Sequence, residues 1–168
     1  MVQQTTYRLR LPSRTENLEL IRDFVSKIAR NAGFSEEEVG KIQLAVDEAC
    51  TNVVKHAYNG DTRKPIDVAV RIDYDRLTIV VADEGKGFDP KAVEISDLSE
   101  YLAELKVGGL GIYLIRTLMD EVEYDIRPGV RNEVRMVKYL LKPDEGERDV
   151  GGGEAGSARK KVAGNSRG

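Results

Sequence analysis

The chain has 168 residues, of which 40% are hydrophobic and 33% are charged, so it has enough apolar material for one packed domain. Its net charge of -3 gives no support to bulk binding of nucleic acid or of an anionic membrane. No apolar run approaches the roughly 20 residues that a membrane-spanning helix needs, and residues 1–10 have no apolar signal-peptide core. We therefore expect a cytoplasmic protein.

A single cysteine, Cys50, and a single histidine, His56, limit the chemistry that the chain can support. One cysteine excludes an internal disulfide framework and a cysteine-based zinc site. One histidine makes a histidine-cluster metal site or a Ser-His-Asp triad hard to build.

The first 60 residues show one strand pattern and two helix patterns. Residues 6–11 alternate apolar and polar side chains, which predicts a strand. Residues 15–32 carry apolar side chains at spacings of three and four, which predicts an amphipathic helix. Ser35 opens a second helix that should run to about Ala57, because Ser35 and Glu38 have capping-box spacing and each can satisfy an unpaired backbone N–H.

Four more strands, another helix and a short helical segment are predicted in the rest of the chain. They are strands over 66–72 and 77–82 joined as a hairpin, one or two helical turns within 98–105, a buried helix over 110–119, and strands over 122–126 and 134–141. We expect the apolar residues of the buried helix, Leu110 among them, to lie in the core.

This order of elements predicts an α+β fold. We expect a two-layer sandwich in which a mixed, mostly antiparallel sheet is covered on one face by helices. The predicted domain spans residues 1–143. Residues 144–168 contain seven glycines and almost no large apolar side chain, so we expect a disordered tail there.

Glu48 and Asn52 form the first motif that suggests chemistry. They are four residues apart on the second helix, so both project from one face. A carboxylate in this place can act as a base, and an amide can offer a neutral oxygen to a hard cation such as Mg²⁺. The alternative is an ordinary solvated helix face.

The second motif follows an apolar strand that ends at Asp83. Gly85 and Gly87 come next, and glycines let a backbone approach a ligand closely or adopt positive φ. A carboxylate at a buried strand end can accept a hydrogen bond from an exocyclic amine. The alternative is a tight turn with a solvated aspartate.

The third motif is a glycine run, Gly108, Gly109 and Gly111, at the start of the apolar helix. Free N–H groups at a helix N-terminus form an anion site that suits phosphates. The alternative is a flexible hinge before a core helix. The run is no Walker-type P-loop and no dinucleotide fingerprint, because neither GxxxxGK[ST] nor a complete GxGxxG after a first strand occurs.

Together the three motifs resemble the N, G1 and G2 boxes of the GHKL ATPase superfamily, which implies the Bergerat fold. The segments EACTNVVKHAY, RLTIVVADEGKGFD and GGLGIYLIRTLMDEV are similar to the anti-sigma factors that are also serine-protein kinases, the RsbW and SpoIIAB type. The resemblance covers roughly residues 6–141.

The resemblance implies a role for each matching residue. Glu48 matches the general base toward the incoming hydroxyl, Asn52 the magnesium-binding asparagine, and Asp83 the aspartate that reads the adenine amino group. Gly85 and Gly87 match glycines that let the nucleotide lie close. The implied cofactors are ATP and Mg²⁺.

Further nucleotide-binding residues are implied near the phosphates. Gly109 and Gly111 match the glycines of the G2 box. The residues that the resemblance implies as nucleotide-binding also include Gly108, Leu110 and Lys106. Residues from 89 to 106 correspond to the ATP lid of the family.

One stretch departs from the family pattern. The family often has a Gly-Thr pair before its last strand, with the threonine near adenine. Here Arg131 and Asn132 stand in its place. Asn132 can still form hydrogen bonds, but the usual contact is not assured by the sequence.

The resemblance also implies partners. They are a STAS-type anti-anti-sigma protein phosphorylated on serine, an alternative stress-response sigma factor of the sigma-B type, and a second copy of the chain in a homodimer. No nucleic acid or membrane partner is implied. Two other functions stay open: a kinase-inactive module that binds nucleotide and sequesters a partner, and an RsbT-like switch kinase.

Overall fold

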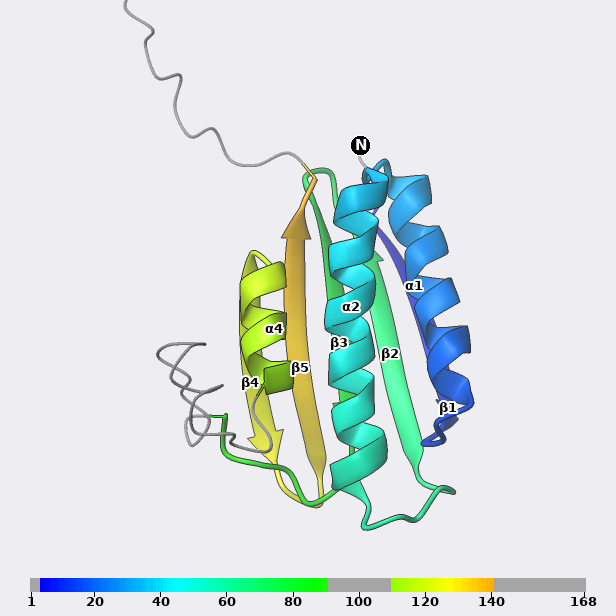
Figure 1. Ribbon diagram of the computed structural model, residues 1–168, viewed down its shortest axis with the longest axis vertical. Coiled ribbons are helices and arrows are strands. Elements are labelled where there is room, and N and C mark those ends of the chain that lie inside the picture. Colours follow the sequence, from blue (N-terminus) through cyan, green and yellow to red (C-terminus); the bar gives the residue numbers. More distant parts are fainter. Residues whose placement is uncertain (1–3, 91–109, 141–168) are drawn as a thin grey trace, which may run out of the picture.

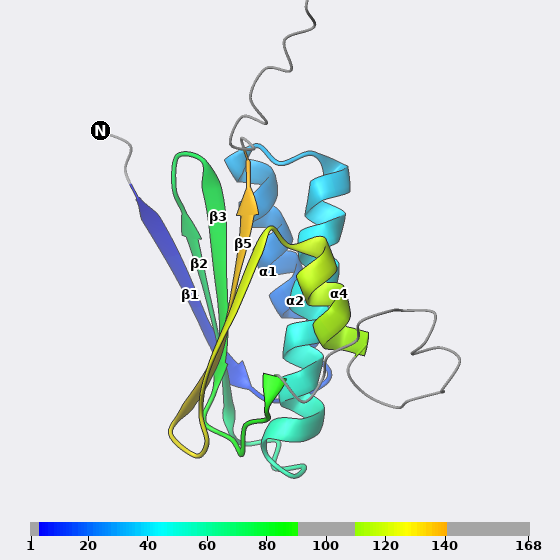
Figure 2. The same cartoon turned by 90° about the vertical axis from the view of Figure 1, so that its left-hand side faces the viewer.

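The computed structural model describes residues 4–90 and 110–140. A sheet forms one layer, and helices α1, α2 and α4 lie together on one of its faces (Figure 1 and Figure 2). None of the helices in the described ranges is long and apolar enough to cross a membrane. In chain order the elements are β1 (Thr5–Pro12), α1 (Asn17–Ala32), α2 (Glu36–Asn52), the π-helix η1 (Val53–Ala57), β2 (Pro65–Ile72), β3 (Arg76–Asp83), α4 (Leu110–Leu118), β4 (Glu121–Arg127) and β5 (Arg131–Tyr139).

The sheet has five strands in the order β1-β2-β3-β5-β4, and each described pairing is antiparallel. The last strand, β5, therefore lies inside the sheet between β3 and β4. Its register with β3 places Asn132 opposite Asp83, although the two residues are 49 positions apart. The predicted α+β sandwich with helices on one face is confirmed. The sheet was expected to be mixed and mostly antiparallel, and it is antiparallel in each described pairing.

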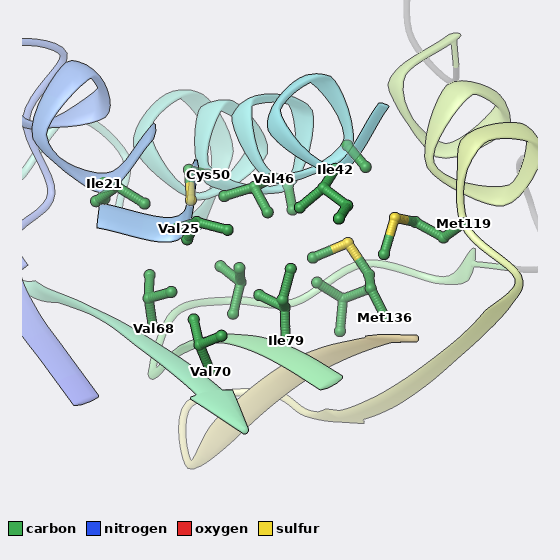
Figure 3. Close-up of a cluster of buried hydrophobic side chains, with 14 of the residues drawn as sticks. Ile21, Val25, Ile42, Val46, Cys50, Val68, Val70, Ile79, Met119 and Met136 are labelled. Carbon is green, nitrogen blue, oxygen red and sulfur yellow. The ribbon is translucent and has the colours of Figure 1, made fainter. Parts of the chain in front are cut away.

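The core lies between the sheet and the helices. Figure 3 shows Val68, Val70 and Ile79 of the sheet facing Val25 of α1 and Val46 of α2. All five are at most 1% exposed, and burying a side chain of this size contributes about 1.5–3 kcal/mol. The period of two in β2 and the three-to-four spacing in the helices turn these residues to one interior.

The junction between α1 and α2 is set by two local signals. Gly33 ends α1 with φ 101°, a left-handed conformation that favours glycine. Ser35 then caps α2, because its hydroxyl accepts a hydrogen bond from the Glu38 N–H at 3.2 Å. The predicted reciprocal bond from the Glu38 side chain is not among the described contacts. That carboxylate instead pairs with Lys138 and Lys41, each at 3.2 Å.

The helix that precedes β4 differs in one detail from expectation. Ile112 and Ile115 are buried as predicted, but Leu110 is 37% exposed and lines a cavity instead of the core. The helical turns expected within 98–105 and the tail expected over 144–168 lie outside the described residues.

Candidate functional site

The end of α2 supplies one wall of a cavity. Ala49 and Val53 are buried, while Glu48 and Asn52, one turn apart, are half-buried beside them. After Asn52 the helix widens into η1, and its residues His56 and Ala57 reach the same cavity. A π-helical turn at the end of an α-helix is frequent at functional sites.

The loop after β3 is built around glycines that admit no side chain. A Cβ on Gly85 would stand 2.1 Å from the carbonyl oxygen of Ala57, so only glycine fits there. Gly87 has φ 67°, and a Cβ on it would stand 2.8 Å from Ile126 Cγ2. At these two positions glycine permits the close approach of protein to protein. The close approach of a ligand to this loop stays a prediction.

Backbone contacts anchor this loop on three sides. The N–H of Lys86 donates to the Ala57 carbonyl at 3.0 Å, and the N–H of Gly129 donates to the Gly85 carbonyl at 2.7 Å. The N–H of Glu84 donates to the Tyr58 hydroxyl at 2.8 Å. That hydroxyl donates in turn to Pro65 O at 2.6 Å, and burial raises its pKa, so it stays a donor. The loop is therefore held to η1 and to the turn between β4 and β5.

Asp83 ends β3 with its carboxylate at the cavity. Its Oδ1 accepts two hydrogen bonds, from the Gly85 N–H at 2.8 Å and from Asn132 Nδ2 at 3.0 Å. Asn132 Nδ2 also donates to the Gly85 carbonyl at 2.9 Å. Both Asp83 and Asn132 line the cavity, so the strand-end carboxylate is oriented by a neighbour on β5.

The first turn of α4 meets the end of α2. A Cβ on Gly111 would stand 2.7 Å from Glu48 Oε2 and 3.7 Å from both Asn52 Oδ1 and Nδ2. The Gly111 backbone thus lies against the carboxylate and the amide that the sequence places on one helix face. Lys106, Gly108 and Gly109 of the predicted phosphate set lie outside the described residues.

The cavity that these elements enclose has a volume of about 290 Å³. That is close to the lower end of the range for small-molecule pockets, about 300–1,000 Å³. Its apolar wall comes from both layers of the fold: Ala49, Val53, Val81, Ile112, Ile115 and Val134. Its polar groups include two clusters, one of Asn52 beside Gly111 and Glu48, the other of Asp83 beside Asn132. His56, Tyr124 and Glu133 also line the cavity.

Five of the predicted site residues line this cavity: Asn52, Asp83, Gly87, Leu110 and Gly111. Glu48 and Gly85 adjoin it without lining it, the first behind Gly111 and the second against Ala57. The motifs therefore converge on one place in the fold. A second hollow, of about 440 Å³, lies at the turn between β2 and β3, and its arginines are paired with carboxylates.

The sequence motifs missed two polar residues of the cavity, Tyr124 and Glu133. The Tyr124 ring lies edge-on to Phe88, with 5.6 Å between centroids, and its hydroxyl is buried without a hydrogen-bond partner in the described residues. Burial raises the pKa of Tyr124 to about 12, against a smaller opposing effect of the Arg116 charge. Side chains along β4 alternate between the two faces of the sheet, and Tyr124 is at an inward position. This alternation was the only sequence pattern that indicated its place.

Comparison with known proteins identifies the family. Residues 11–138 match the family model of the histidine kinase-like ATPase domain. A serine-protein kinase RsbW of Bacillus pumilus is 42% identical over 139 residues, which cover 79% of this chain and 84% of that protein. The RsbW of Listeria monocytogenes is 41% identical over 136 residues, which cover 79% and 85% of the two chains.

Solved structures support the fold. The RsbU and RsbW domains of Rv1364c from Mycobacterium tuberculosis match with a TM-score of 0.59 at 16% identity, over 83% of this chain and 33% of that chain. The SiaB–SiaC complex from Pseudomonas aeruginosa contains a chain that matches with a TM-score of 0.60 at 14% identity, over 78% of this chain and 88% of that one. The ATP-binding fold predicted from three short motifs is thereby confirmed, and the chain belongs to the RsbW family of serine-protein kinases, with an ATPase domain of the histidine kinase-like type.

Proposed function

We propose that this protein is an anti-sigma factor that uses ATP to phosphorylate a serine of a STAS-type anti-anti-sigma protein, and that it sequesters an alternative sigma factor. The observation that carries the proposal is the convergence at one cavity of Asp83, Asn52 and the first turn of α4, with Glu48 directly behind Gly111. These groups match the two ends of a nucleoside triphosphate.

The adenine end is assigned to the cluster around Asp83. A carboxylate that already accepts two hydrogen bonds through Oδ1 has its second oxygen available for a donor on the ligand, such as the adenine amino group. The apolar residues Val81, Val134 and Ile126 line the same cavity, and they suit the faces of a purine ring.

The phosphate end is assigned to Asn52 and Gly111. No group of three or more His, Cys, Asp or Glu in the described ranges could hold a metal ion by itself. A neutral amide oxygen fits Mg²⁺ when phosphate oxygens supply further ligands, and the ion would then offset phosphate charge. The Gly111 position at the start of α4 fits this end, because backbone N–H groups of a first helical turn favour anions.

Glu48 is assigned the base. In the transfer, the serine oxygen forms a bond to the γ-phosphorus while the bond from that phosphorus to the β,γ-bridging oxygen breaks and ADP leaves. The serine proton passes to the Glu48 carboxylate. General base catalysis of this kind is worth roughly 10²–10⁴-fold. The remaining catalysis is positioning and electrostatic stabilisation.

The partners rest on family membership. Relatives about 40% identical are named serine-protein kinases, and one structural neighbour was solved in a SiaB–SiaC complex. A protein substrate and a sequestered sigma factor are what the family resemblance implies for this chain. We also expect a homodimer, which light scattering of the purified protein tests directly.

Incubation of the protein with labelled ATP, Mg²⁺ and candidate STAS proteins encoded nearby tests the proposal. The parent should label a serine of one partner, and Glu48→Gln should lose at least about 100-fold in rate while it keeps ADP binding. Glu37→Gln is the matched control, because this α2 carboxylate is 81% exposed in the first turn, away from the cavity. Nucleotide binding without transfer in the parent would favour the kinase-inactive binding module instead.

A further inference from the structure

Asn132 is a polar residue in a position where burial is costly. It is 3% exposed on β5, opposite Asp83 in the sheet register, and it lines the cavity. A buried amide is costly when its donors and acceptors lack hydrogen-bond partners. Its Nδ2 has partners through two bonds, to Asp83 Oδ1 at 3.0 Å and to the Gly85 carbonyl at 2.9 Å.

The orientation of this amide follows from its surroundings. If the amide were rotated by 180°, its oxygen would face Asp83 Oδ1 and the Gly85 carbonyl, which are both acceptors. Nδ2 therefore points at the carboxylate. Asn132 Oδ1 then lies 2.9 Å from the place of a Cβ on Gly87, and it is buried with no hydrogen-bond partner in the described residues.

The two oxygens of the Asp83 carboxylate therefore have different hydrogen-bond partners. Oδ1 takes the bonds from Asn132 Nδ2 and from the Gly85 N–H. No described residue donates a hydrogen bond to Oδ2. The carboxylate is thus fixed by protein donors on one oxygen and can accept from a ligand on the other.

The geometry points to Asn132 as the positioning residue that sets the base selectivity of the cavity, through Asp83. An oriented carboxylate oxygen accepts a hydrogen bond from a purine with an amino group at C6. It repels a purine with a carbonyl at C6, because two acceptors then face each other. This inference rests on the proposed function and goes beyond it, because it assigns discrimination to a residue that departs from the family pattern.

The test compares ADP with IDP, which differs from ADP in carrying a carbonyl in place of the C6 amino group. Calorimetry should give a clear preference of the parent for ADP. Asn132→Ala should reduce the ratio of the two affinities at least about tenfold, because the carboxylate loses a fixed orientation. The affinity of Asn132→Ala for IDP, which is weaker than that for ADP, should stay within about twofold of the parent's affinity for IDP. The base of IDP gains nothing from Oδ2.

A double-mutant cycle distinguishes positioning from a general structural role. Asp83→Ala removes the carboxylate on which Asn132 is inferred to act. The double variant Asp83→Ala/Asn132→Ala should therefore show the same ratio as Asp83→Ala alone. Asn31→Ala, at an exposed asparagine of α1, is the control and should leave the ratio unchanged.

Two results would overturn the inference while the proposed function stands: equal loss of ADP and IDP affinity in Asn132→Ala, or additive effects in the cycle. A parent that binds neither nucleotide would instead overturn the proposed function. If Asn132→Ala does not fold, Asn132→Ser is measured in its place. Its hydroxyl keeps one donor, so its ratio should fall between those of the parent and of Asp83→Ala, and a ratio equal to that of the parent would contradict the inference.

Discussion

Gly111 of α4 lies directly against Glu48 of α2: a Cβ at position 111 would stand 2.7 Å from Glu48 Oε2. The first turn of α4 and the residue assigned as the base are therefore so close that no side chain fits between them. Any side chain at position 111 has to displace the carboxylate, since the Glu48 side chain can rotate more easily than the backbone can move.

Gly111→Ala is accordingly expected to impair phosphoryl transfer more than folding. The methyl group pushes aside the flexible end of Glu48, so the free energy of unfolding should change by less than about 1 kcal/mol. The rate of serine labelling should fall at least about tenfold, because small misplacements of a catalytic group are expensive. Urea unfolding and a labelled-ATP assay measure the two quantities. A labelling rate equal to that of the parent would separate Glu48 from the chemistry.

Gly40→Ala is a matched glycine substitution that should increase stability and leave phosphoryl transfer unchanged. Gly40 lies inside α2, and a Cβ there would meet no atom within 4 Å. Alanine in an open helix interior should raise the free energy of unfolding by about 0.5–1 kcal/mol. Urea unfolding checks this, and serine labelling should stay at the rate of the parent. A destabilised variant would show that the space beside Gly40 is filled.

Gly85→Ala is expected to damage the fold itself. Here the added Cβ would meet the Ala57 carbonyl, a backbone group that cannot move without disturbing η1. Overpacking of this kind typically costs about 1–3 kcal/mol and occasionally more. The midpoint of urea unfolding should fall by the corresponding amount. An unchanged midpoint would contradict the close approach of the loop to η1.

Lys138→Met tests a buried ion pair that joins β5 to α2. Lys138 is 5% exposed, donates to the Leu118 carbonyl at 2.9 Å and pairs with Glu38 at 3.2 Å. Burial raises the pKa of Glu38, but the hydrogen bonds and charges of Lys138 and Lys41 outweigh it and hold that pKa below the ordinary value of 4.5. Because Glu38 keeps some exposure, the variant should lose about 1–3 kcal/mol at neutral pH, less than for a fully buried pair.

The pH dependence of this loss has a definite sign. A carboxyl whose pKa is lowered by folding stabilises the protein at pH values above its pKa in the unfolded state. This contribution is lost as the pH falls through its pKa in the folded state. The difference in unfolding free energy between the parent and Lys138→Met should therefore shrink as pH falls below about 4.5. A difference that stays constant down to pH 3 would mean that Glu38 is not the partner.

Tyr124→Phe tests the unpaired hydroxyl in the cavity. Since that hydroxyl has no partner in the described residues, its removal should change stability by no more than about 1 kcal/mol near pH 7. Burial raises the pKa of Tyr124 to about 12, so the neutral phenol stabilises the fold below the ordinary value of 10.0. That contribution to stability is lost as the pH rises from this ordinary pKa through the higher pKa of Tyr124 in the folded protein. Spectroscopic titration of tyrosinate should show a group with a pKa near 12 in the parent that is absent from the variant.

The elements of the fold could be predicted from the sequence because they depend on local periodicity. The helix predicted over 15–32 is observed as Asn17–Ala32, and the strand predicted over 66–72 as Pro65–Ile72. The Ser35 cap was also predictable, since a cap needs only three neighbouring residues. The reciprocal bond from the Glu38 side chain was predicted wrongly, because Lys138, a hundred positions away, pairs with that carboxylate.

The motifs likewise named three principal residues of the cavity. Asn52, Asp83 and Gly111 carry recognisable spacing along the chain, and all three line it. Tyr124 and Glu133 carry no such spacing. They reach the cavity because of where their strands pair, and strand pairing between distant segments leaves no local pattern.

The sequence by itself therefore determined the helices and strands, the fold class and the family, because periodic side-chain patterns and short motifs act over a few residues. Only the tertiary structure decided the strand order β1-β2-β3-β5-β4 and the meeting of Asp83 with Asn132. The tertiary structure also decided why glycine is needed at two positions. Gly85 lies close to the Ala57 carbonyl and Gly111 lies close to the Glu48 carboxylate, and both of these groups are distant in sequence. Close contacts between remote segments depend on packing of the whole chain, and no local preference encodes them.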